Sequence, residues 1–189
     1  MIVLITGPVR SGKSTRAVRV ARDLACPVTH VVTARIDPTD VEMADRIARH
    51  RSERGAEPVI DVWQPNTPGL ADIIALAPAH TTLLVDSIGS WVAGQLLDLE
   101  TLAARDALAT LARLEALAAP LLECLTSVQA NVVLIAEETG WGLVPTTAQG
   151  RVFRDHVGRL TRRIGALAGR VELVVAGYAL DLRSWGTPI

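Results

Sequence analysis

The strongest constraint on this chain comes from a glycine-rich stretch that directly follows an apolar segment. Residues 7–14 read Gly-Pro-Val-Arg-Ser-Gly-Lys-Ser and match the pattern G-x-x-x-x-G-K-[S/T] at every position. The apolar run Ile2–Thr6 is an expected strand before this pattern, and Lys13–Ala25 is an expected helix after it. The chain has 19 lysine and arginine residues together, and Lys13 is the only lysine among them. This context separates the stretch from a chance glycine-lysine turn, so it predicts a phosphate-binding loop.

Such a loop is expected to bind a nucleoside triphosphate together with Mg²⁺. Glycines allow backbone N–H groups to surround an anion, and the amino terminus of the following helix adds partial positive charge. Lys13 is expected to act catalytically on the β- and γ-phosphates, and the Ser14 hydroxyl to be a Mg²⁺ ligand. The predicted nucleotide-binding residues of the loop are Gly7, Pro8, Val9, Arg10, Ser11, Gly12, Lys13 and Ser14.

An acidic partner for the loop is expected at the end of another strand. The run Thr82–Asp86 is apolar up to its final aspartate, and Ser87 follows as a helix start. Asp86 is therefore a predicted nucleotide-binding residue and Mg²⁺ ligand, directly or through water. The alternative is that Asp86 or Ser87 only caps the next helix.

Short apolar runs alternate with helical patterns along the rest of the chain. Continuous rather than alternating apolar runs are typical of strands covered on both faces. The pattern predicts an α/β fold of the P-loop NTPase type, RecA-like, in which one domain over residues 1–189 has a mostly parallel sheet with helices on both faces. The further expected strands are 28–33, 59–62, 82–86, 131–136, 172–176 and 178–182, and the further helices are 41–54, 69–76, 88–97, 101–128 and 149–168.

Composition narrows the possible partners. A net charge of −1 and a 3% aromatic content argue against a protein that coats nucleic acid or an acidic membrane. Cys26 and Cys124 fit no metal spacing and are expected to be reduced core thiols. No targeting or membrane-spanning segment is evident, so a cytoplasmic protein is expected.

The expected helix 41–54 carries a histidine among arginines. Met43, Ile47 and His50 follow at spacings of four and three, which places His50 beside the apolar face. The residues alone leave two interpretations open. His50 is either a structural residue next to a solvated arginine face or a chemical group.

The sequence resembles the bifunctional adenosylcobinamide kinase/adenosylcobinamide-phosphate guanylyltransferase family of cobalamin biosynthesis over nearly its whole length. The phosphate loop alone would not separate this family from many others, whereas the Arg-Ile-x-x-His-Arg helix and the Gly-x-Gly-x-Val-Pro stretch are far more specific. The matching pieces are the loop with Arg10–Ser14, Thr33-Ala34, Glu42-Met43, Arg46-Ile47, His50-Arg51, Leu83–Asp86, Glu138 with Gly140, Gly142 and Val144-Pro145, Phe153–Asp155, Gly158-Arg159 and Val174–Gly177.

The resemblance implies two activities. The kinase would transfer the γ-phosphoryl group of ATP or GTP to a hydroxyl of adenosylcobinamide. The guanylyltransferase would use His50 as a catalytic nucleophile that carries GMP before the phosphorylated corrinoid takes it. The resemblance also implies a homotrimer and adds nucleotide-binding residues to the loop and Asp86, namely Thr33, Ala34, Arg35, Arg51, Ser52, Glu53 and Arg54.

Departures from the family pattern keep other functions open. Gly55, Pro58, Ile60 and Val62 stand where the family usually has Pro, Trp, Thr and Glu, and Trp63 is out of register. Glu137 replaces a common asparagine, and Thr161-Arg162 replaces an Asn-Gln pair.

These departures motivate one alternative, a kinase-only paralogue that acts on a corrinoid or a small hydroxyl substrate. The α/β pattern permits a second, a regulatory P-loop NTPase that binds nucleic acid or a protein partner, because a fold does not fix a function. The preference for ATP or GTP, the corrinoid contacts and the general base of the kinase step stay open, the base among Asp86, Glu137 and Glu138.

Overall fold

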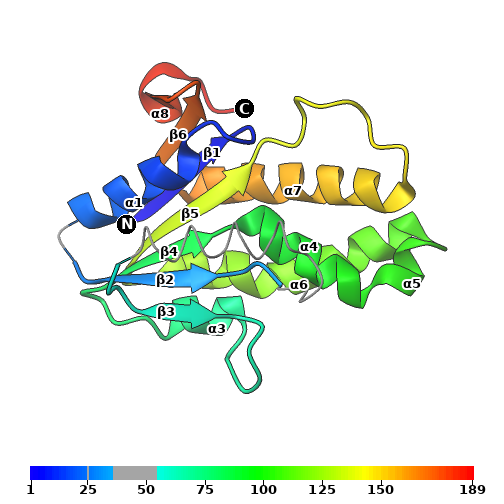
Figure 1. The fold of residues 1–189 in the computed structure, drawn as a ribbon, viewed down its shortest axis with the longest axis horizontal. Helices are drawn as coiled ribbons and strands as arrows, with labels where there is room; N and C mark the ends of the chain where they lie inside the picture. Colours follow the sequence, from blue (N-terminus) through cyan, green and yellow to red (C-terminus); the bar gives the residue numbers. More distant parts are fainter. Residues whose placement is uncertain (25, 36–54) are drawn as a thin grey trace.

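The computed structural model describes residues 1–24, 26–35 and 55–189, and in this part of the chain all seven strands form one sheet (Figure 1). The strand order is β3-β2-β4-β5-β1-β6-β7. The strands are β1 (Ile2–Gly7), β2 (Val28–Val32), β3 (Val59–Asp61), β4 (Thr82–Asp86), β5 (Asn131–Glu137), β6 (Arg170–Val175) and β7 (Tyr178–Asp181).

The sheet is parallel from β3 to β6, and only β7 runs antiparallel, as a hairpin with β6. Strand β5 lies between β1, which enters the phosphate loop, and β4, which ends in Asp86. This order is that of RecA-like P-loop proteins, so the predicted fold class is confirmed. Because parallel strands end at the same edge, the loop, Asp86 and Glu137 all lie along the carboxyl edge of the sheet.

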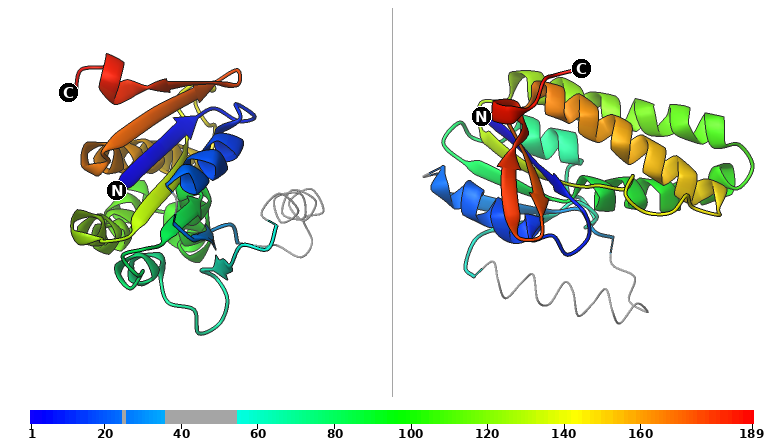
Figure 2. Two further views of the ribbon diagram at one scale, coloured as in Figure 1. Left: turned by 90° about the vertical axis from the view of Figure 1, so that its left-hand side faces the viewer. Right: turned by 90° about the horizontal axis from the view of Figure 1, so that it is seen from above.

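Helices cover both faces of the sheet, as the continuous apolar strands predict. On one face α1 (Lys13–Asp23) packs against Val3 and Ile5 of β1. On the other face Leu4 packs into a larger core. The main helices other than α1 cover this face (Figure 2). These helices are α3 (Leu70–Ala75), α4 (Ile88–Asp98), α6 (Ala107–Ser127) and α7 (Ala148–Leu167).

Two helix predictions need correction. The single helix expected over 101–128 is two helices, α5 (Glu100–Ala103) and α6, because Asp106 caps α6 by accepting a hydrogen bond from the Ala109 N–H. The spacing of Phe153, Val157, Leu160, Ile164 and Leu167 also predicts one apolar stripe on α7, which the structure confirms only in part. His156 and Val152 are buried there, whereas Leu167 is 38% exposed at the helix end.

The remaining elements lie close to their expected positions. The short helix α8 (Leu182–Trp185) follows β7 and was not expected. Cys26 and Cys124 are free and half-buried. The expected helix 41–54 lies outside the described residues. Within the described residues no helix has the length and apolar character to cross a membrane.

Candidate active site

The phosphate loop forms a tight turn between β1 and α1. Arg10 and Gly12 have positive φ angles of 58° and 98°, and Gly12 occupies the N-cap position of α1. A side chain at position 7 would collide with the carbonyl oxygen of Val174 and with the Ser11 hydroxyl, so only glycine fits there. The first N–H groups of α1 therefore open toward the centre of the loop.

Neighbouring strands hold the loop from both sides. The Glu138 N–H donates to the Gly7 carbonyl at 3.0 Å, and the Gly177 N–H donates to the Ser11 carbonyl at 3.1 Å. The Glu138 carboxylate also accepts a hydrogen bond from the Thr6 hydroxyl at 2.7 Å. The turn that follows β6 has φ angles of 50° at Ala176 and 82° at Gly177, and it supports the loop on the side away from β5.

An ion pair fixes helix α1 against the sheet. Arg16 donates two hydrogen bonds of 2.8 Å to Glu172 on β6, and Arg170 also pairs with Glu172. The hydrogen bond from Arg16 lowers the pKa of the Glu172 carboxyl, which is only 2% exposed. The helix that begins at Lys13 is therefore held by a charge-assisted contact three residues from its start.

The predicted loop residues divide into exposed and buried groups. Val9 is 72% exposed, whereas Lys13 is only 6% exposed and its Nζ donates to the Pro8 carbonyl at a long 3.4 Å. The Ser11 hydroxyl is buried and has no hydrogen-bond partner within the described residues. A long, easily exchanged bond at Lys13 and an unpartnered hydroxyl at Ser11 fit a loop that takes its remaining contacts from a phosphate group.

Asp86 ends β4, and the turn after it is braced from two strands. Ser87 is the N-cap of α4, accepting from the Ser90 N–H, so the capping role belongs to Ser87 and not to Asp86. On one side Thr33 donates from its N–H to the Asp86 carbonyl at 3.2 Å and from its hydroxyl to the Ser87 carbonyl at 2.6 Å. On the other side Glu137 accepts from the Ser87 hydroxyl at 2.5 Å and from the Gly89 N–H at 2.9 Å.

The donor set at this edge suits Mg²⁺. Ser14 and Asp86 offer a hydroxyl and a carboxylate, which are hard oxygen ligands, and both residues are half-buried. The described residues contain no group of three or more His, Cys, Asp or Glu side chains placed to hold a metal. Magnesium in triphosphate sites takes one or two protein ligands and completes its shell with phosphates and water, so this sparse set fits it.

The sequence leaves Asp86, Glu137 and Glu138 as candidates for the general base, and the contacts of the two glutamates differ. Both carboxylate oxygens of Glu137 are used by Ser87 and Gly89 at the start of α4. Glu138 accepts from Thr6 through one oxygen. Glu137 is therefore best described as a brace for the Asp86 turn.

The residues that follow β2 make contacts with other elements of the fold. Thr33 is fully buried, and its carbonyl accepts a 2.7 Å hydrogen bond from the Trp63 indole N–H. The Arg35 guanidinium lies over the Trp63 ring, 5.4 Å from its centroid, and pairs with Asp98. Thr33 and Arg35 are thus joined to Trp63, and Ala34 between them is partly exposed at the carboxyl edge.

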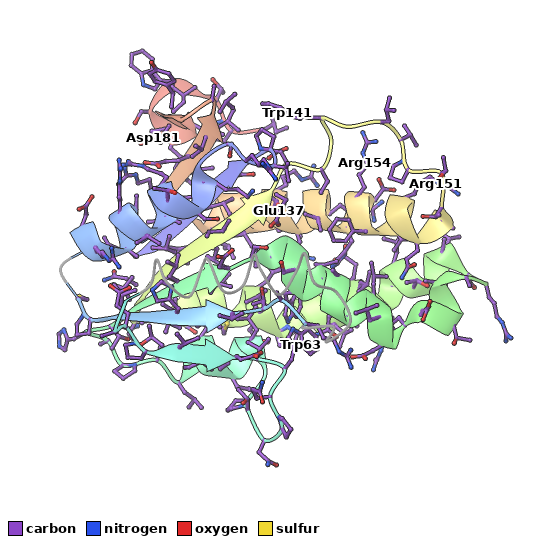
Figure 3. The ribbon with its side chains drawn as sticks, viewed as in Figure 1. Trp63, Glu137, Trp141, Arg151, Arg154 and Asp181 are labelled. Atoms are coloured by element: carbon purple, nitrogen blue, oxygen red, sulfur yellow. The ribbon has the colours of Figure 1, made fainter. Side chains whose placement is uncertain are left out.

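A cavity of about 570 Å³ opens beside the end of β5. One wall is residues 137–140, and the other is α7 from Arg154 to Arg162. Figure 3 shows Arg154 between α7 and the long loop that joins β5 to α7. This site has no counterpart among the predicted binding residues, although Glu138, Gly140 and Gly158-Arg159 belong to the stretches that carry the family resemblance.

Several predicted site residues lie outside the described part of the chain. These are the nucleophile His50 and the nucleotide-binding residues Arg51, Ser52, Glu53 and Arg54. The structure thus brings together the phosphate loop, Asp86 and the cavity, and the roles of residues 50–54 stay predictions. The braces formed by Glu137 and Trp63 had no local sequence signal, because each joins residues far apart in the chain.

Comparison with known proteins gives a family match over most of the chain. Residues 3–182 match the model of the family described as cobinamide kinase / cobinamide phosphate guanyltransferase.

Curated relatives agree with this match. The bifunctional adenosylcobalamin biosynthesis protein CobP of Pseudomonas aeruginosa is 34% identical over 189 residues, covering 98% of each chain. The CobU proteins of Escherichia coli and Salmonella typhimurium are 31% and 34% identical, and each alignment covers 97% of this chain and 100% of the relative. Among solved structures, the flagellar accessory protein FlaH of Methanocaldococcus jannaschii aligns at 16% identity with a TM-score of 0.44, over 100% of this chain and 81% of that chain.

Proposed function

Because this chain belongs to the cobinamide kinase / cobinamide phosphate guanyltransferase family, we propose that it phosphorylates adenosylcobinamide and then transfers GMP to the product. The observation that carries this proposal is the family match over residues 3–182 together with a folded phosphate loop on the same sheet edge as Asp86. The partners are a nucleoside triphosphate and a corrinoid, without nucleic acid. The chain would act in the cytoplasm as a homo-oligomer, with a trimer implied by the family resemblance.

In the kinase step the chain positions the triphosphate and stabilises its charge. The N–H groups of the loop and the start of α1 surround the β-phosphate, and Lys13 exchanges its long bond to Pro8 for contacts with the β- and γ-phosphates. Ser14 and Asp86 would hold Mg²⁺, which neutralises charge on the transferred group. The bond from the γ-phosphorus to its bridging oxygen breaks and releases the nucleoside diphosphate, as the acceptor hydroxyl oxygen bonds to that phosphorus and passes its proton to a base or to water.

In the guanylyl step His50 is the proposed nucleophile. A ring nitrogen of His50 bonds to the α-phosphorus of GTP, and the bond to the bridging oxygen breaks to release pyrophosphate. A phosphate oxygen of the phosphorylated corrinoid then bonds to the same phosphorus and displaces the imidazole. Arg51 and Arg54 lie within four residues of His50 and would offset charge on the phosphates during both displacements.

A labelling experiment tests the guanylyl half of this proposal. The protein is incubated with Mg²⁺ and GTP labelled on the α-phosphate, without acceptor, and the denatured chain is examined for label. Label that is stable to base, released by acid and absent from His50→Ala is the expected result.

The same variants separate the two steps. His50→Ala should lose GMP transfer and keep most of its phosphorylation of cobinamide, whereas Lys13→Ala should lose both by at least about 100-fold, because Lys13 contacts the triphosphate in each. GMP transfer by His50→Ala would disprove the covalent step. A wild-type chain that binds GTP and phosphorylates cobinamide without being labelled would be a kinase only.

A further inference from the structure

We propose that the cavity between the end of β5 and α7 binds the amide-bearing edge of the corrinoid acceptor. This inference rests on the proposed function, since it identifies where that function's second substrate binds. This space, the α7 cavity, is lined by residues 137–140 and by α7 from Arg154 to Arg162.

The α7 cavity lies directly beside the phosphate loop. Glu138, which lines the cavity, bonds through its N–H to Gly7 and through its carboxylate to Thr6. Thr6 and Gly7 are the last residues of β1 before the loop. A ligand in the cavity is therefore next to the triphosphate, as an acceptor hydroxyl has to be for direct transfer.

The charges around the α7 cavity favour a neutral ligand with both donors and acceptors. Three arginines line it together with three carboxylates, so its formal charge is balanced, unlike that of a site for a second polyphosphate. Carboxamides offer a carbonyl oxygen to arginine and an N–H group to a carboxylate. The lining residues that carry charge are Glu137, Glu138, Arg154, Asp155, Arg159 and Arg162.

Two buried polar atoms of the lining residues point to a missing partner. The Nη1 atom of Arg154 and the hydroxyl of Thr161 have no hydrogen bond within the described residues. The other terminal nitrogen of Arg154 donates to the Gly140 carbonyl at 3.1 Å, which fixes the guanidinium against the loop. Buried polar groups without hydrogen-bond partners destabilise the free protein. A ligand amide that bonds to them after a small side-chain rotation removes this cost and therefore binds more tightly.

An apolar surface borders this polar cavity. Trp141, Leu143 and Val144 are 58%, 96% and 69% exposed, and they follow Gly140 of the cavity wall. Arg151 holds the loop on α7 by donating to the carbonyls of Pro145 and Thr146, so the apolar side chains are carried on an anchored loop (Figure 3). A corrinoid has this same pairing of a broad apolar ring with an amide rim.

Neighbouring arginines provide a matched test. Arg162 lines the cavity, whereas Arg163 pairs with Glu115 through a 2.7 Å hydrogen bond outside it. Cobinamide binding is measured by equilibrium dialysis without nucleotide, and the KM values for cobinamide and ATP are measured in the kinase assay. Arg162→Ala should weaken cobinamide binding by roughly tenfold or more with little change in the KM for ATP, and Arg163→Ala should stay within about twofold of wild type.

Two further substitutions, the second with a matched control, guard against a folding artefact. Thr161→Val keeps the shape and removes the hydroxyl, and it should also weaken cobinamide binding without changing the melting temperature by more than a few degrees. Trp141→Ala should weaken binding several-fold, whereas Trp185→Ala removes a tryptophan of α8 that is 81% exposed and should have no effect.

The outcomes separate this inference from the function on which it rests. If wild type phosphorylates cobinamide but Arg162→Ala and Thr161→Val bind it normally, the cavity assignment is wrong and the function stands. An equal rise in the KM for ATP would make the cavity part of the nucleotide site and overturn the assignment. If wild type neither binds nor phosphorylates cobinamide, both proposals fail.

Discussion

At the scale of single residues, His156 is the least expected side chain in the core. It is 1% exposed on α7, and neither ring nitrogen has a hydrogen bond within the described residues. The nearest charged group is Glu115, with an oxygen 3.4 Å from Nδ1, and Arg159 and Arg163 also act on the ring. Burial has the largest effect and lowers the pKa of His156, so the fold favours the neutral imidazole.

This predicts a loss of stability under mild acid. A histidine with a lowered pKa in the folded state contributes its full stability above its ordinary pKa of 6.5, and that contribution falls as the pH drops below it. His156→Leu should remove this dependence of stability on pH, because leucine fills the buried position and does not titrate. Urea unfolding at pH 7.5 and 5.5 measures the difference, and parallel losses in wild type and variant would contradict the argument.

At the scale of elements, glycines on two helices have opposite surroundings. A β-carbon at Gly94 of α4 would collide with the Trp63 ring, because this glycine lets the tryptophan approach the helix backbone. A β-carbon at Gly158 of α7 would meet nothing within 4 Å. The same substitution should therefore act in opposite directions.

Alanine at the two positions tests this contrast. Gly94→Ala should destabilise the protein by about 1–3 kcal/mol, because overpacking outweighs the gain in helix propensity. Gly158→Ala should stabilise it by about 0.5–1 kcal/mol, since only the backbone entropy term changes. Thermal and urea unfolding of both variants provide the measurement, and destabilisation by Gly158→Ala would show that its surroundings are closed.

At the scale of the whole molecule, ion pairs tie α1 to strands on both sides of it. Arg16 pairs with Glu172 on β6, and Arg22 pairs with Glu57 just before β3. The His30 ring on β2 also shares a hydrogen bond with Glu57. Hydrogen bonds from Arg16 and Arg22 respectively have the largest effect in lowering the pKa values of Glu172 and Glu57. The helix behind the phosphate loop is thus joined to distant parts of the sheet through carboxylates.

Acid should weaken these ties in a defined range. A carboxyl with a lowered pKa stabilises the fold fully above its ordinary value of 4.5, and this stability is lost as the pH falls through the folded-state pKa. Glu172→Gln should cost about 3 kcal/mol at neutral pH, because it leaves Arg16 and Arg170 without their carboxylate. Its unfolding free energy should also fall less steeply than that of wild type below pH 4.5, as urea titrations would measure.

Local patterns were sufficient for much of the fold. Residues 82–86 form the strand expected over the same residues, and β1 differs from its predicted range by one residue, because apolar runs bounded by turn residues carry their own signal. The break between α5 and α6 was missed, although Asp106 is a typical cap, because alanine and leucine continue the helical pattern across it.

The sequence by itself determined the phosphate loop, the acid at the end of β4 and the family, since each is written in neighbouring residues or in motifs along the chain. Only the tertiary structure decided that Glu137 and Thr33 brace the Asp86 turn, that Arg16 holds α1 on β6, and that α7 and β5 enclose a cavity. The physical reason is that these contacts join residues far apart in the chain. Their partners are set by strand order and helix packing, which no local pattern records.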